Sequence, residues 1–296
     1  MKSKLSELLE SSRENVKEEL GSVPEVCNFE GVLAPSDLAI VKRKWISIKD
    51  AIVVVVDLKN STKLGVKKWA SSTARIYQAS TGNVVNIFDT FEADFIAIQG
   101  DGAFAIFWGQ DRVERALCSA ITVKTFGLDL VDQLDSKWDS LPETGLKVGI
   151  SSGRLLAKKI GVAGRQDWQE PVWPGRAVNY AFKAAAAANR HELIVTKSVW
   201  DKIKSNDFLR YSCGCGDPTS DLWESKEIDK LPSGDNEASG MVLVSSWCPN
   251  HGEEFCEAVL NGETERKNLN SDRMKIALSK KKEQDRAAIR NRGRKF

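Results

Sequence analysis

The sequence contains no apolar run approaching the ~18 residues that a membrane-spanning helix requires. Its first twenty residues, MKSKLSELLESSRENVKEEL, carry charges throughout and lack the uninterrupted apolar segment of a secretory signal. Six cysteines without such a signal do not indicate a disulfide framework, and no internal repeat is visible. These absences predict a cytoplasmic protein with no membrane partner.

The composition indicates a globular chain with an unevenly distributed charge. Hydrophobic residues make up 42% and charged residues 28% of the 296 residues, which is ordinary for a globular protein with a sizeable core. The net charge is only +2, yet residues 262–296 contain 12 Lys and Arg against 5 Asp and Glu. A basic tail can reach nucleic acid or anionic lipid. This one lacks the interleaved aromatic residues that stack on bases, so we expect a solvated terminus and no nucleic-acid partner.

Apolar periodicity predicts an alternation of strands and helices in the central part of the chain. AIVVVVDL is typical of a buried strand, and two apolar runs flank the Asp-Gly step of FIAIQGDGAFAIFW, which predicts a hairpin. Helical spacing of apolar residues predicts helices over about 67–88 and 111–134. LKVGISSGRLLAKKIG and ELIVT are strand-like and bracket the alanine-rich helix GRAVNYAFKAAAAANR. This order predicts an α+β fold with a ferredoxin-like βαββαβ core.

Two aspartates stand where predicted strands end. Asp57 closes the valine strand, and Asp101 lies at the tip of the hairpin expected beside it. Two carboxylates meeting there would bind hard divalent cations, and two metal ions ~3.5–4 Å apart can activate an attacking oxygen and neutralise a departing phosphate. A structural role, as a turn residue or helix cap, stays open for each aspartate alone. The polar turn after Asp57 offers backbone N–H groups of the kind that hold phosphate, which makes candidates of Asn60, Ser61 and Thr62.

Four stretches resemble, in order, the four signature blocks of class III nucleotidyl cyclases: VVVVDLKNST, IQGDGAFAIF, LKVGISSGRLLAKKIG and WPGRAVNYAFKAAAAANRHELIVT. The resemblance covers about residues 50–200, and the last block matches without a gap from Gly175 through Thr196. It implies a ferredoxin-like domain that works as a head-to-tail homodimer with active sites at the interface. It also implies that a nucleoside triphosphate is converted to its 3′,5′-cyclic monophosphate and pyrophosphate.

The resemblance assigns the metal site residue by residue. Asp57 and Asp101 match the two metal-binding aspartates of the family, and the Leu58 carbonyl matches a further ligand. The implied cofactors are two Mn²⁺ ions, or Mg²⁺, in each active site. One ion would help to deprotonate the ribose 3′-hydroxyl, and the other would hold the β- and γ-phosphate oxygens.

Two residues of the alanine-rich helix match the family's contribution from the second subunit. Asn179 matches the asparagine that orients the ribose, and Lys183 stands where an arginine usually stabilises the transition state. Lysine keeps the positive charge but lacks the planar fork of a guanidinium, so slower catalysis is an open outcome. Arg176 and Arg190 are candidates to assist it.

The base-reading positions depart from those of purine cyclases. Ala97 and Val172 stand where adenylate and guanylate cyclases carry polar residues, and neither side chain can read a base edge by hydrogen bonding. The departures resemble the bacterial pyrimidine cyclases of antiphage defence, the Pycsar type. We therefore expect UTP as substrate, with CTP next. Two alternatives remain: a purine cyclase with an atypical base pocket, and an inactive homologue that serves as a nucleotide-binding regulatory module.

These patterns divide the chain into four predicted parts. Residues 1–45 form an N-terminal helical extension, and residues 46–205 form the nucleotidyl cyclase catalytic domain. Residues 206–261 form a cysteine-containing subregion, and residues 262–296 form the basic tail. The subregion brings two short cysteine motifs, CGC and CPNHGEEFC, into one part of the sequence. They could form a structural zinc site with ligands drawn from Cys213, Cys215, Cys248, His251 and Cys256. We favour buried or free thiols, because the C-x-C spacing is tighter than usual and the two motifs are separated by over thirty residues.

Overall fold

The computed structural model describes residues 2–29, 31, 33–34, 37–38, 40, 43–64, 70–138, 142–215 and 218–269. Most of the predicted basic tail, residues 270–296, lies outside the described residues. Across the described part of the chain, no helix is both long enough and apolar enough to cross a membrane.

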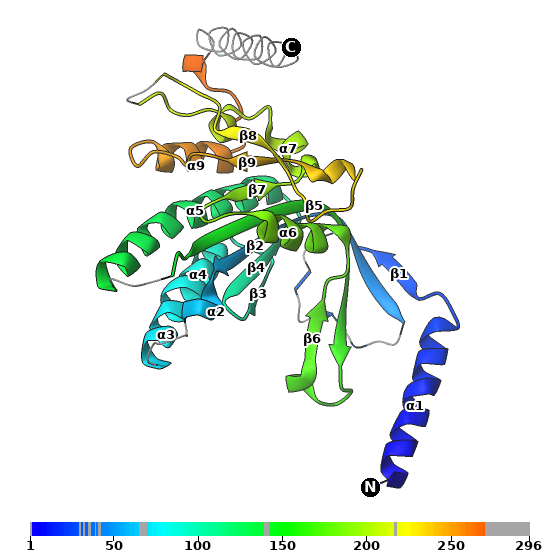
Figure 1. The fold of residues 1–296 in the computed structure, drawn as a ribbon. Helices are drawn as coiled ribbons and strands as arrows, with labels where there is room; N and C mark the ends of the chain where they lie inside the picture. The colour runs from blue at the N-terminus through cyan, green and yellow to red at the C-terminus, as the bar shows by residue number, and fades with distance from the viewer. Residues whose placement is uncertain are drawn as a thin grey trace, which may run out of the picture.

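A mixed sheet of nine strands organises the chain (Figure 1). Its main path runs β3–β4–β2–β5–β7–β9–β8; β1 joins β2, and β6 joins β5. The β5–β7 and β1–β2 pairs are parallel, and the other pairs are antiparallel. The strands are β1 (Glu25–Asn28), β2 (Lys44–Lys59), β3 (Phe95–Gln99), β4 (Gly102–Phe107), β5 (Gly145–Gly161), β6 (Gln169–Val172), β7 (Leu193–Val195), β8 (Trp223–Glu227) and β9 (Ser239–Leu243).

Helices connect these strands in the predicted order. A helical segment follows β2, the β3–β4 hairpin comes next, and α5 then leads into β5, so the predicted α+β class is confirmed. The helices are α1 (Lys2–Leu20), α2 (Ser61–Leu64), α3 (Ala70–Tyr77), α4 (Asn83–Thr90), α5 (Arg112–Lys137), α6 (Arg176–Ala187), α7 (Lys197–Ile203), α8 (Asp207–Arg210) and α9 (Gly252–Leu260).

The helix predicted over 67–88 is described from residue 70, and residues 67–69 lie outside the described part. It runs to Thr90 as α3, the π-helical turn η2 (Gln78–Gly82) and α4. Ser80 Oγ, in this turn, donates to the carbonyl oxygen of Ile76 in α3, 2.8 Å away. Single π turns inside α-helices often mark functional sites, and η2 lies beside the β3–β4 hairpin, as described below.

The valine run of β2 is buried on both faces of the sheet. Val54 and Val56 enter a first core with residues of α4, α5 and α9, whereas Val53 and Val55 enter a second core with residues of α6. Each of these valines is at most 2% exposed, so each stabilises the fold by about 1.5–3 kcal/mol. Burial on both faces explains why β2 is apolar at every position from Ala51 to Val56.

The chain ends extend this central body. Helix α1 is exposed along its described length and projects away from the sheet (Figure 1). Strand β1, within the predicted N-terminal extension, pairs with β2 in the main sheet. At the other end, β9 pairs with β7 and α9 contributes Phe255 and Val259 to the first core. The cysteine-containing subregion therefore shares both the sheet and the core of the central part.

Candidate active site

The strand register brings the two predicted metal aspartates to adjoining positions. Val56 of β2 pairs with Ala103 of β4, so Asp57 continues opposite Gly102, and Asp101 is the next residue. A Cβ atom on Gly102 would lie 2.4 Å from the Val56 carbonyl oxygen and 3.4 Å from the Asp57 Cα atom. Glycine at this position therefore lets the two backbones approach closely where both carboxylates are carried.

The hairpin is confirmed, but its turn is one residue earlier than the predicted Asp-Gly turn. Gln99 pairs with Gly102, which leaves Gly100 and Asp101 as the two central turn residues. Gly100 has a φ angle of +63°, a left-handed conformation that glycine adopts without strain. The turn thus depends on Gly100, while Gly102 serves the contact with β2.

The π turn η2 contacts this hairpin directly. Thr81 Oγ1 donates a hydrogen bond to the Asp101 carbonyl oxygen at 3.0 Å, and Thr81 is buried. This contact fixes the backbone of the turn that carries the Asp101 carboxylate. Sequence periodicity did not identify Thr81, because it lies in a turn that departs from the α-helical repeat.

Lys147 is a second residue that sequence reasoning missed. The β2–β5 register pairs it with Asp57, and its Nζ atom lies 2.5 Å from the Asp57 Oδ2 atom. The Lys147 side chain is 15% exposed and the Asp57 side chain is 41% exposed, so the pair lies at the surface of the sheet with the carboxylate more open. The carboxylate of Asp57 is therefore placed to face positive charge.

The turn after Asp57 has a specific backbone conformation. Asn60 has a φ angle of +60°, and its Nδ2 atom donates to the Glu143 carbonyl oxygen at 2.6 Å. Its own carbonyl oxygen accepts from the N–H groups of Lys63 and Leu64. Ser61 and Thr62 then begin the short helix α2. The Asn60 side chain is thus engaged in holding the turn. Leu58 is 2% exposed and packs in the first core, so its backbone carbonyl, not its side chain, is the group available as a ligand.

A cavity of about 250 Å³ adjoins Asp57. Asp57, Gln99 and Gly102 line it from the strands, and α6 contributes Phe182, Ala185 and Ala186. Of the described α6 residues, neither Asn179 nor Lys183 lines this cavity. Asn179 is exposed, and the Lys183 Nζ atom lies 6.0 Å from the centroid of the Tyr180 ring. A single chain therefore carries the two aspartates at neighbouring backbone positions, but of these two only Asp57 lines the cavity, and the two predicted helix residues do not.

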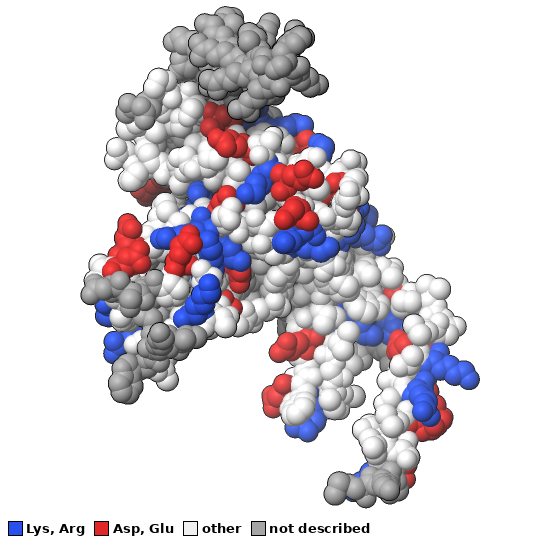
Figure 2. Space-filling view, in the orientation of Figure 1, with Lys and Arg blue, Asp and Glu red and all other residues white. Residues whose placement is uncertain are grey.

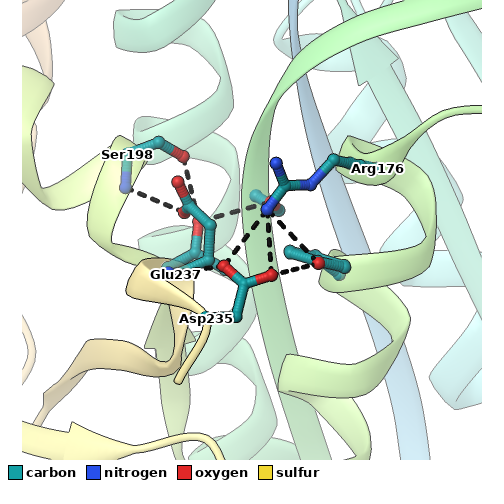
Figure 3. Close-up of polar contacts among 7 residues, drawn as sticks. Arg176, Ser198, Asp235 and Glu237 are labelled. Carbon is teal, nitrogen blue, oxygen red and sulfur yellow. Dashed lines mark hydrogen bonds and ion pairs between the residues drawn. The ribbon is translucent and has the colours of Figure 1, made fainter. Parts of the chain in front are cut away.

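Both arginines named as possible assistants have partners in their own chain. The Arg176 side chain points toward Asp235 (Figure 3). Its Nη2 atom lies 2.9 Å from Asp235 Oδ2 and 3.3 Å from the Tyr180 hydroxyl. Asp235 lies just before the 3₁₀ turn η4 (Asn236–Ala238), whose Glu237 accepts a hydrogen bond from the Ser198 N–H group. Arg190 Nε lies 2.7 Å from the His191 Nε2 atom. These contacts hold both guanidinium groups in their own chain.

The two predicted base positions lie beside one aromatic cluster. Ala97 of β3 is half-buried and pairs with Phe104, and Val172 ends β6, where it pairs with Lys158. The ring of Trp173 lies 4.8 Å, centroid to centroid, from that of Phe95. The residue after Val172 thus packs on the residue two positions before Ala97, and Ala97 itself packs against the second core.

The structure brings together four of the five predicted zinc ligands. One ligand atom from each of Cys213, Cys215, Cys248 and His251 lies within 4.8 Å of all the others. We refer to these residues as the four-ligand cluster. The hydrogen bond with His251 lowers the pKa of the Cys248 thiol to about 7, whereas burial raises that of Cys213.

The inclusion of Cys256 among the zinc ligands was wrong. Cys256 lies within α9 and packs against the first core, where its carbonyl oxygen accepts from the Cys118 thiol at 3.8 Å. The helix begins directly after His251, so the later cysteine is carried away from the cluster toward α5. Cys256 is thus close to His251 in the sequence but is not part of the four-ligand cluster.

The face of the molecule in Figure 2 carries charges of both signs. On the side of the molecule shown in Figure 2, the Lys and Arg side chains of the described residues are interspersed with Asp and Glu. The tail residues on which a nucleic-acid alternative would depend lie mainly in 270–296, outside the described part.

The sequence of residues 46–215 matches the family model of the adenylate and guanylate cyclase catalytic domain. A uridylate cyclase from Micromonospora echinofusca is 53% identical over 270 residues, which cover 91% of this chain and 88% of that protein. A uridylate cyclase from Propioniciclava tarda is 46% identical and covers 81% of this chain and 80% of its own. One from Burkholderia cepacia is 30% identical over 70% of this chain and 86% of its own.

Solved structures share the fold at low sequence identity. The adenylyl cyclase CyaB from P. aeruginosa superposes with a TM-score of 0.55 at 15% identity, over 68% of this chain and 96% of its own. A class III adenylyl cyclase-like ATP-binding protein from Pseudomonas aeruginosa gives a TM-score of 0.52 at 14% identity, over 86% of this chain and 49% of its own. The mixed sheet with its helices is thus the fold of these cyclase domains.

Proposed function

Because this chain belongs to the class III adenylate and guanylate cyclase family, we propose that it is a uridylate cyclase, which converts UTP to 3′,5′-cyclic UMP and pyrophosphate. The observation that carries the reaction type is the meeting of Asp57 and the Asp101 turn beside a cavity. The uracil base is inferred from the relatives named uridylate cyclases, at 53% and 46% identity over most of the chain. The apolar side chains of Ala97 and Val172 agree with a base other than a purine.

The residues fit a pair of divalent cations. Asp57, Asp101 and the Leu58 carbonyl provide an all-oxygen donor set, which Mn²⁺ and Mg²⁺ prefer. The Asp57 carboxylate already faces a cation, the Lys147 ammonium group, and Gly102 leaves the strands free to approach. When bound, the two cations would neutralise phosphate charge and make the ribose 3′-hydroxyl more acidic.

The proposed reaction forms one bond and breaks another at the α-phosphorus. The ribose 3′-oxygen attacks, its proton passes to water, and the bond to the bridging oxygen breaks, so that pyrophosphate leaves with the electron pair. Lys147, beside Asp57, supplies fixed positive charge for the leaving pyrophosphate. Asn179 orients the ribose, and Lys183 meets the charge that develops on the α-phosphate. Most of the rate would come from this positioning and charge stabilisation.

We propose that a second copy of the chain completes each site in a head-to-tail dimer. In one chain, the described cavity beside Asp57 is lined by the apolar residues of α6 and not by Asn179 or Lys183. A two-fold dimer would place these two residues of one copy against the aspartates of the other and create two equivalent sites. Residues 46–205 would form the catalytic unit that dimerises.

Thr81→Val is expected to lower kcat for UTP about tenfold with little change in KM. The substitution keeps the side-chain shape but leaves the Asp101 carbonyl oxygen without its donor, at a cost of about 1–3 kcal/mol. Thr122→Val is the matched control, because Thr122 donates to the Cys118 carbonyl within α5. Steady-state kinetics of both variants test the role of the π turn. Equal kcat values for the two variants would contradict it.

The test of the proposed function is a turnover assay with UTP, CTP, ATP and GTP, each with Mn²⁺ and with Mg²⁺, and with products identified by mass. Cyclic UMP as the main product is the expected result. Cyclic CMP as the main product would show that the preferred substrate is CTP and not UTP. A cyclic purine product would show that Ala97 and Val172 do not mark the base preference. No product from any nucleotide, together with measurable nucleotide binding, would replace the proposal with a regulatory binding module.

The resemblance to Pycsar-type cyclases supports a further part of this proposal, that cyclic UMP acts as a second messenger in bacterial antiphage defence. Infected cells that express this chain should accumulate cyclic UMP. Cells that express an Asp57→Asn chain should not.

A further inference from the structure

Two loops of the C-terminal subregion meet at the four-ligand cluster. Cys213 and Cys215 follow α8, whereas Cys248 and His251 directly precede α9, over thirty residues later. The Cys213 and Cys248 Sγ atoms are 3.3 Å apart, and Cys248 Sγ lies 3.3 Å from His251 Nδ1. Three sulfur atoms and one imidazole nitrogen thus converge from two separate loops.

We propose that the four-ligand cluster binds one structural zinc ion. Tetrahedral zinc with Zn–S bonds of about 2.3 Å and Zn–N bonds of about 2.0–2.1 Å holds neighbouring ligand atoms roughly 3.5–3.8 Å apart. The cluster approaches this spacing, with all four ligand atoms within 4.8 Å of one another. Three thiolates and one imidazole fill the four positions, leaving none for water or substrate, which is characteristic of a structural site.

Hydrogen bonds from neighbouring groups support the ligands. The Cys215 N–H group donates to Cys213 Sγ at 3.3 Å, and Asn250 Nδ2 lies 3.8 Å from Cys215 Sγ. Arg266 Nη1 donates to the carbonyl oxygens of Tyr211 and Ser212, at 3.1 and 2.8 Å. Zinc with three thiolates carries a net charge of −1, so the guanidinium beside this loop is of the complementary sign.

The zinc site would hold α9 and its preceding loop against the body of the protein. The Trp247 indole N–H, next to Cys248, donates to the Phe208 carbonyl oxygen of α8 at 3.0 Å. Phe208 and Phe255, from α8 and α9, pack with their ring centroids 5.4 Å apart. The metal would therefore close the loop that carries β8 and β9, and its binding energy would add to the stability of this end of the sheet.

The first test is the zinc content of the full-length protein, purified without chelators and measured by elemental mass spectrometry. About one zinc per chain is expected for a closed four-ligand site. Cys215→Ser should lose the zinc and lower Tm by roughly 5 °C or more. Cys27→Ser is the matched control, since Cys27 lies in β1 and contacts Glu25. It should retain both the zinc and the wild-type Tm.

A second measurement separates this site from the catalytic metals and from loss of folding. Zinc content should be unchanged in an Asp57→Asn/Asp101→Asn chain, which retains the four-ligand cluster. Wild-type protein stripped with a chelator should regain its Tm on addition of Zn²⁺, and added Co²⁺ should give the visible absorption of tetrahedral cobalt with thiolate ligands.

Three results would overturn the proposal. One is wild-type protein that holds little zinc and gives no tetrahedral cobalt spectrum. Another is zinc that persists in a folded Cys215→Ser chain. The third is a mass lower by two hydrogens under non-reducing conditions, with Cys213 and Cys248 joined in one peptide, which would assign their close contact to a disulfide.

Discussion

Asp57→Asn and Asp101→Asn chains are expected to lose cyclic UMP production, with kcat for UTP lower by roughly 10³-fold or more. Each substitution keeps the size of the side chain and removes one negative charge from the proposed metal site, where several kcal/mol of transition-state stabilisation originate. The measurement is steady-state turnover of UTP with Mn²⁺, with the product quantified by mass spectrometry.

The control for this experiment is Asp89→Asn, at an exposed position near the end of α4. It should retain wild-type kcat. The fold of the Asp57 variant should persist, because a partly exposed ion pair such as Asp57–Lys147 contributes only about 0–1 kcal/mol to stability. Folded Asp57→Asn protein with more than about a tenth of the wild-type kcat would exclude a metal-binding role for this carboxylate.

Two inactive chains are expected to restore activity when they are combined. One chain carries Asp57→Asn, and the other carries Asn179→Ala with Lys183→Ala. In a head-to-tail heterodimer both lesions fall in the same site, and the second site has wild-type residues from each copy. Heterodimers isolated through two different affinity tags should therefore show about half of the wild-type turnover, because one of two equivalent sites is intact.

The controls are dimers isolated through the same two affinity tags in which both chains carry the same substitutions. These dimers should stay inactive. Heterodimers without activity would contradict the placement of Asn179 and Lys183 opposite the aspartates of the other copy. Full activity of the doubly substituted chain alone would show instead that neither residue takes part in the reaction.

The parts of the fold that follow from local pattern were predicted well. A run of valines leading to Asp57 predicted a buried strand that ends at this carboxylate. The buried strand is present as β2, although it begins earlier, at Lys44, and continues past Asp57 to Lys59. The hairpin around Asp101 was also predicted, although its turn depends on Gly100 and not on the Asp-Gly step. Gly100-Asp101 and Asp101-Gly102 are both typical turn dipeptides, and only the pairing between β3 and β4 shows which of them occupies the turn.

The parts of the site that depend on distant contacts were not predicted. Lys147 meets Asp57 only through the β2–β5 register, across ninety residues of sequence. Thr81 reaches Asp101 from a π turn, which has no distinct hydrophobic period. For the same reason, the sequence grouped Cys256 with the zinc candidates although α9 carries it toward Cys118.

The π turn η2 also constrains the length of the helical segment between residues 70 and 90. Each residue of an α-helix rotates the chain by about 100°, so the extra residue of a π turn resets the angular phase between α3 and α4. Ile76 before the turn and Phe88 after it nevertheless both enter the first core. Deleting or inserting one residue in η2 would change this phase. Either the apolar side chains of α3 or α4 would turn away from the first core, or Thr81 would turn away from the Asp101 carbonyl oxygen. The number of residues in this turn is therefore as strictly constrained as the identity of Thr81, whereas a surface loop would tolerate the same change in length.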